Sequence, residues 1–240
     1  MRDFLELKKI KKTGFWPAVL GGGILAAIVP ILNTAVRKEM FLQLEGNAME
    51  ILMDANWQMM SMLNLLLIVA SACLLYHTEY ADNGMQKMCT LPIKESRMFI
   101  DKFLLLCLSC LIVAVIEGAG MAFSAARWFR GEGKFLWDVT ANMGFAFMLL
   151  LPGVLFMLLI SAVCKNMWIS LGIGVICVFT ATMLPAGNFV LSLFPFALPF
   201  QIFAGTTEAV VHNYIIAAAG ECGLGILAAV LFFKIRRLFA

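Results

Sequence analysis

The sequence predicts an all-α protein that crosses a membrane several times, and three features indicate this fold class. Of the 240 residues, 62% are hydrophobic and only 14% are charged, which leaves too little polar surface for a soluble domain of this size. The apolar residues form runs of about 20, the length that a helix needs to cross a bilayer. The runs do not alternate in polarity as barrel strands do, and a helix satisfies its backbone groups within one segment.

Six apolar runs are predicted to be transmembrane helices within a single membrane domain that covers residues 1–240. They are residues 15–36, 57–76, 103–123, 141–163, 167–184 and 213–233. Lys and Arg favour the cytoplasmic ends of spans, and with the N-terminus inside, thirteen of the 18 basic residues fall on that side. Both termini are therefore expected in the cytoplasm, which requires an even number of spans.

The first 14 residues, MRDFLELKKIKKTG, are predicted to form an amphipathic helix on the inner membrane surface. Phe4, Leu7 and Ile10 fall on one side of such a helix, and the lysines fall mostly elsewhere. A simple cytoplasmic anchor is the alternative. Acidic residues among the bases, and the long apolar run that follows, indicate a membrane anchor rather than a cleaved leader.

The stretch before the last span, residues 185–211, is predicted to dip into the membrane and return on the outer side. No charged residue occurs from Asn166 to Thr207, which is room for two spans. Two spans there would place the basic C-terminal tail outside. Pro185, Pro195 and Pro199 prevent one long straight helix, so a re-entrant pair of short helices is expected. The alternative is an apolar outer loop that rests on the bilayer.

A polar segment follows the second span and is predicted to lie in the cytoplasm. Residues 77–103 carry four acidic and four basic side chains between two apolar runs. Within them, Met85, Met88 and Cys89 fall on one face of a short helix. Two helical turns are not stable alone in water, so we expect this face to dock into a groove of a partner, to which Met side chains adapt well. The alternative is a helix that rests on the lipid surface.

No catalytic centre is apparent in the sequence. The stretch GEGKF, residues 131–135, lacks the first Gly and the Ser or Thr of a phosphate-binding loop. His77 and His212 fall at opposite membrane faces, so they cannot share a metal ion. No HExxH or GxSxG motif occurs, and the seven cysteines fit small core residues better than disulfides. We therefore expect no cofactor, metal or nucleic acid on this chain, which leaves transport, channel or scaffold roles.

The whole chain resembles the permeases of ABC-2-type transporters. The resemblance rests on the six spans, the amphipathic N-terminal segment and the proline-rich stretch before the last span. It also rests on Glu79, Gly84 and the Leu91–Pro92 pair in the inner segment, followed by Lys102 at the start of the third span. The short length and the closeness of the spans resemble the lantibiotic and bacteriocin-immunity permeases within that family.

The resemblance implies a permease that pairs with a second permease, identical or related, in the bacterial plasma membrane. Each permease would bind a cytoplasmic ABC ATPase, which carries ATP and Mg²⁺, through a coupling helix within residues 79–98. The substrate would be an amphipathic peptide or a lipophilic compound, exported from the cell or the membrane. The residues expected at the ATPase contact are Glu79, Gly84, Met85, Lys87, Met88, Leu91 and Pro92.

Three polar residues are expected at one level inside the membrane. Glu117, Glu221 and Asn64 each lie about 9–10 Å below the outer end of their span, at about 1.5 Å per residue. An ionisable group there costs about 2.5 kcal/mol or more, so it should face protein or water rather than lipid. The three groups either lock helices together or form a polar ring on the transport path, and the sequence leaves both open.

Two other functional classes also remain open. The first is a channel or carrier that works without ATP, for which Glu117 and Glu221 are the available intramembrane carboxyl groups. The second is a membrane scaffold without transport activity. Co-purification distinguishes them, because only the ABC permease requires a bound ATPase.

Overall fold

The computed structural model describes residues 10, 13–44, 46–80, 95–129, 135–164, 166–184 and 188–239. Over these residues it is all-α and contains no strand, which confirms the predicted fold class. The elements in chain order are α2 (Phe15–Val36), α3 (Lys38–Leu42), α4 (Ala48–Tyr80), α6 (Glu95–Trp128), α7 (Phe135–Val163), α8 (Met167–Met183), α9 (Phe189–Ser192), the 3-10 helix η2 (Leu198–Phe200) and α10 (Glu208–Phe239).

Five of these helices, α2, α4, α6, α7 and α10, are long and apolar enough to cross a membrane. This confirms a multi-pass membrane protein. Helix α8 is apolar but has 17 residues, at the lower limit of about 17 for a spanning helix. The predicted count of six spans therefore depends on α8 and stays a prediction.

Four of the long helices extend past the predicted spans. Helix α2 has the predicted bounds, but α4 has 33 residues and contains the predicted span 57–76. At about 1.5 Å per residue α4 is about 50 Å long, whereas the hydrocarbon core is about 30 Å thick. Hydropathy marks only the part of a helix that lipid surrounds, so the sequence underestimated the lengths of α4, α6, α7 and α10.

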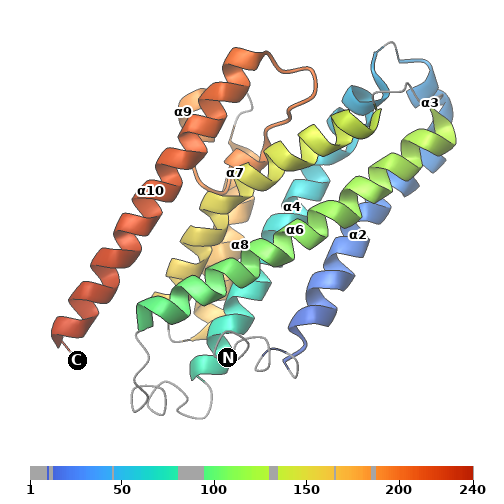
Figure 1. The fold of residues 1–240 in the computed structure, drawn as a ribbon. Helices are drawn as coiled ribbons and strands as arrows, with labels where there is room; N and C mark the ends of the chain where they lie inside the picture. The colour runs from blue at the N-terminus through green and yellow to red at the C-terminus, as the bar shows by residue number, and fades with distance from the viewer. Residues whose placement is uncertain are drawn as a thin grey trace.

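Helices α2, α4, α6, α7, α8 and α10 run in alternating directions along the bundle (Figure 1). The start of α2 and the end of α10 lie at one end, which we call the base, and α3 and the start of α4 lie at the opposite end. An even number of spans requires this arrangement. The predicted interfacial helix at residues 1–14 lies almost wholly outside the described residues.

Helix α4 is central to the bundle. It contacts α2, α6, α7 and α8, while α10 lies at the edge, mainly against α7. Its core residues Leu65 and Val69 are fully buried, together with Val154 and Leu158 of α7. By contrast, α10 exposes many large apolar side chains, as expected of a helix that faces lipid or another membrane protein.

The segment before α10 folds back between helices, as two short helices followed by a loop. Leu198 of η2 is fully buried, and the carbonyl oxygen of Pro199 accepts hydrogen bonds from Trp57 Nε1 (3.0 Å) and Ser61 Oγ (2.8 Å) of α4. Two short helices are what the sequence predicted for residues 185–211. The boundary differs, because α10 begins at Glu208, and residues 185–187 lie outside the described part.

A close contact between α2 and α6 depends on Gly120. A Cβ atom added there would lie 2.6 Å from the carbonyl oxygen of Ala27 and 3.1 Å from its Cβ. Small residues at helix contacts allow backbones in membranes to approach closely. The α2–α6 contact therefore leaves no room for a side chain at this position.

Replacing Gly120 with Ala should lower the thermal stability, because α2 and α6 must move apart. Overpacking of this kind costs about 1–3 kcal/mol. The matched control is Gly144→Ala on α7, since nothing lies within 4 Å of an added Cβ there and Ala favours the helix by about 1 kcal/mol over Gly. Thermal unfolding in detergent would compare them. Equal midpoints for the two variants would contradict the close α2–α6 contact.

Candidate functional site at the base of the bundle

The predicted coupling segment joins the end of α4 to the start of α6. Residues 81–94 lie outside the described residues, and with them six of the seven predicted contact residues: Gly84, Met85, Lys87, Met88, Leu91 and Pro92. The structure does describe the two helix ends from which the segment leaves, Tyr80 and Glu95. These ends contain the seventh predicted residue, Glu79, and Lys102.

A buried ion pair joins the two helix ends. Lys102 Nζ of α6 lies 2.9 Å from Glu79 Oε1 of α4, and the two side chains are only 1% and 4% exposed. Buried charges cost free energy unless they are paired and hydrogen-bonded. Lys102 Nζ also lies 5.7 Å from the centre of the Tyr76 ring, within the range of a cation–π interaction. The pair therefore fixes the position of α4 against α6 where the inner segment begins and ends.

Aromatic side chains extend this contact to α7. Tyr76 and Tyr80 lie four residues apart on α4, hence on one helix face, and their rings stack with centres 6.2 Å apart. The Tyr80 hydroxyl donates a hydrogen bond of 2.8 Å to the carbonyl oxygen of Ala162, near the end of α7. Three long helices thus meet around the Glu79–Lys102 pair.

A second, weaker ion pair links α10 to the same base. Arg236 Nε lies 3.5 Å from Glu95 Oε2, with side chains 28% and 33% exposed. Phe233 also packs edge-to-face on Phe99 of α6, with ring centres 5.4 Å apart. A partly exposed ion pair contributes about 0–1 kcal/mol, so the aromatic contact is the firmer part of this link.

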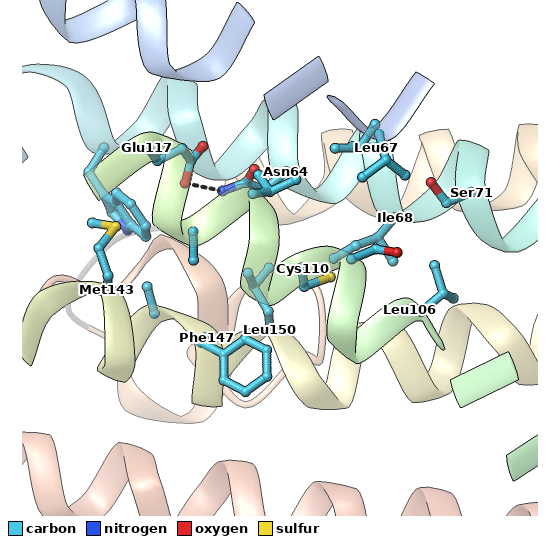
Figure 2. A pocket seen from close by; sticks show the side chains of 16 residues that line it. Asn64, Leu67, Ile68, Ser71, Leu106, Cys110, Glu117, Met143, Phe147 and Leu150 are labelled. Atoms are coloured by element: carbon cyan, nitrogen blue, oxygen red, sulfur yellow. Dashed lines mark hydrogen bonds between the residues drawn. The ribbon is translucent and has the colours of Figure 1, made fainter. Parts of the chain in front are cut away.

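Farther along the bundle, the structure brings together two of the three predicted intramembrane polar residues. Asn64 Nδ2 of α4 donates a hydrogen bond of 3.0 Å to Glu117 Oε2 of α6, and both side chains are buried. Figure 2 shows the two bonded side chains side by side in the lining of a cavity between α4, α6 and α7. Glu221 of α10 is also buried but does not line this cavity. The three polar residues that were predicted at one level therefore do not form a single site in this structure.

Metal ligands are not grouped at either place. Among the described residues, no three His, Cys, Asp or Glu side chains lie close enough together to hold a metal ion. The six described cysteines are free thiols.

The sequence analysis named Glu79 and Lys102 separately and missed their pairing. Glu79 was predicted to contact the ATPase, and Lys102 only marked the start of a span. Opposite charges at the polar ends of two consecutive apolar runs are the signal that could have found the pair. Tyr76 and Tyr80 carried no signal in the sequence, because aromatic residues are common at the ends of spans.

Fold and site together define a multi-pass helical membrane protein in which a buried ion pair anchors the connection between its second and third long helices. A family model described as ABC-2 family transporter protein matches residues 4–181, well over half of the chain, and the chain therefore belongs to this family. No curated protein and no solved structure matched it. Membership supports a permease subunit of an ABC exporter and implies association with ABC ATPase subunits.

Replacing Lys102 with Met should destabilise the protein strongly, because the buried carboxylate of Glu79 would lose the ammonium group that lies 2.9 Å from it. Breaking a buried pair in this way costs about 3–5 kcal/mol. The control Arg236→Met breaks the partly exposed pair with Glu95 and should cost about 0–1 kcal/mol.

Thermal unfolding of the purified variants would measure both losses. The double variant Glu79→Gln/Lys102→Met should regain much of the stability, because it removes both charges at once. A Lys102→Met variant as stable as Arg236→Met would contradict the anchoring role of the buried pair.

Proposed function

We propose that this chain is the permease subunit of an ATP-driven ABC-2-type exporter of the bacterial plasma membrane, and that residues 79–98 couple it to the ATPase. Family membership supports the class. The observation that carries the coupling role is the buried Glu79–Lys102 pair. An inner segment that only connected two spans would not need a buried ion pair between the two helix ends that it joins.

The pair gives a physical route from the inner segment into the bundle. A force on residues 81–94 acts on the ends of α4 and α6, which the ion pair and Tyr76 hold together. Helix α6 passes the movement to α2 and α7, and α4 passes it to α7 and α8. At its other end, α4 holds the carbonyl oxygen of Pro199 through Trp57 and Ser61. One continuous helix thus links the inner segment to the folded-back segment before α10.

ATP and Mg²⁺ belong to the partner ATPase in this proposal, and the transport path lies between this chain and a second permease, identical or related. The size of the internal cavity supports a path of this kind. The cavity beside Glu117 has a volume of only about 20 Å³, which is far too little for a peptide. The exposed apolar surface of the bundle suits a substrate taken from the membrane, an amphipathic peptide or a lipophilic compound, as in the lantibiotic-immunity permeases.

Changing Met88 to Asp should separate the permease from its ATPase. The predicted short helix turns Met85, Met88 and Cys89 toward the partner, and an unpaired charge in that contact costs several kcal/mol. Thr90→Asp is the matched control, because position 90 falls on the opposite face of that helix. Co-purification with the co-expressed ATPase would measure the effect. An intact, transporting complex with Met88→Asp would refute the assignment of this face.

The predicted topology can be tested by labelling single cysteines in a cysteine-free background with a reagent that does not cross the membrane. A Cys at Gly46 or Gly131 should be labelled from outside intact cells, since the predicted topology assigns both positions to outer connections. A Cys at Gly84 or Ala240 should be labelled only after the cells are opened. Labelling of position 240 from outside would require an odd number of spans and would contradict the re-entrant segment.

A further inference from the structure

The cavity between α4, α6 and α7 contains polar atoms that the described residues leave without hydrogen bonds. Asn64, Ser71 and Glu117 line it, and each is at least 95% buried. Asn64 Oδ1, Ser71 Oγ and Glu117 Oε1 have no hydrogen-bond partner among the described residues. Buried polar atoms nearly always have a partner, so these atoms indicate that the cavity holds something.

Two of these atoms belong to one polar pair. Asn64 Nδ2 already donates to Glu117 Oε2, so the same two side chains leave Asn64 Oδ1 and Glu117 Oε1 for a ligand (Figure 2). Ser71 lies two helical turns from Asn64, about 10 Å away at 1.5 Å per residue, and belongs to the other end of the cavity. The ligand is therefore bound by Asn64 and Glu117.

The size of the cavity limits the ligand to about one water molecule. The centre of a water-sized sphere can occupy about 20 Å³ of it, and a single water needs about 10–15 Å³ measured in this way. A polar cavity of that size with at least two hydrogen-bonding partners is the kind of place where buried water is found. A substrate of several atoms does not fit.

The charge around Glu117 favours the neutral carboxylic acid. The groups facing the cavity are Val19 of α2, Trp57 and Asn64 of α4, Cys110 of α6 and Met143 of α7, with further apolar side chains and Ser109 beside them. None of the described residues that line it is Lys, Arg or His. A carboxylate inside a membrane protein requires a cation or water-filled surroundings. This cavity has no cationic side chain among the described residues that line it and room for only about one water.

We propose that Asn64 and Glu117 form a binding site for one proton and one water molecule. The Asn64 Nδ2–H group donates to Glu117 Oε2, the Glu117 Oε1–H group donates to the water, and the water donates to Asn64 Oδ1. Every polar atom of the two side chains that faces the cavity then has a partner, and no charge is buried. The site ties α4 to α6 independently of the Glu79–Lys102 pair, and it does not depend on the proposed transport function.

Infrared spectra of the purified protein in lipid at pH 7 test the proton. The wild type should show the C=O stretch of a carboxylic acid, shifted in D₂O, and Glu117→Gln should lose that band. Glu221→Gln is the matched control and should keep the band that Glu117→Gln loses. In Asn64→Leu the band should move to higher frequency, because the C=O group loses its donor. Loss of a carboxylate band instead in Glu117→Gln would overturn the proposal, and so would an unchanged spectrum.

Hydroxyl-radical labelling of the wild type tests the water. A buried Met is labelled when a bound water lies beside it, so Met143, which lines the cavity, should be oxidised. Met157 is fully buried and does not line the cavity, so it should stay unlabelled. A Met143 as unreactive as Met157 would show a dry cavity and would overturn the bound water. This measurement needs no variant, so it does not depend on how Glu117→Gln folds.

Discussion

The contact between Glu79 and Lys102 is the constraint on which the base of this bundle depends. Two opposite charges lie 2.9 Å apart and are almost fully buried. They lie near the end of α4 and the start of α6. Buried charges of this kind are weak sources of net stability, but each strongly requires its partner. The pair therefore fixes position more than it adds stability. Tyr76 beside Lys102 and the Tyr80 hydrogen bond to α7 depend on the same placement of α4.

Helix α4 carries that placement through the bundle. It holds Glu79 near one end, the Asn64–Glu117 hydrogen bond in the middle, and Trp57 and Ser61 against Pro199 toward the other end. The first two contacts join α4 to α6, and the third joins it to the segment before α10, each through buried polar groups. Displacement of one end of α4 must stretch or move the others, which suits a helix that transmits movement. Helix α10 lies at the edge and takes less part in this network.

The sequence predicted the helical class and the multi-pass architecture, because these depend on composition and on the lengths of apolar runs. The transporter family followed from a resemblance of particular residues in the inner segment and of the proline-rich stretch before the last span. The bounds of α2 also agree with the prediction, since Gly14 and Arg37 flank a run without charged residues. The contacts between side chains of different helices could not be predicted from the sequence. Glu79 and Lys102 are 23 residues apart, and Asn64 and Glu117 are 53 apart. Which side chains meet depends on the relative shift of two helices, which neither helix encodes alone. Gly120 carried no signal for the same reason, because only its distance from Ala27 makes it essential.

The central claim is that the ends of α4 and α6 move as one rigid base when the partner ATPase works. Spin labels at His77 on α4 and Ser96 on α6, both exposed positions, would report the distance across the base in the reconstituted transporter. Labelled copies diluted with unlabelled ones would restrict the signal to one chain. The account predicts the same distance distribution without nucleotide and with ATP trapped. A distribution that shifts by several ångströms on ATP binding would contradict it.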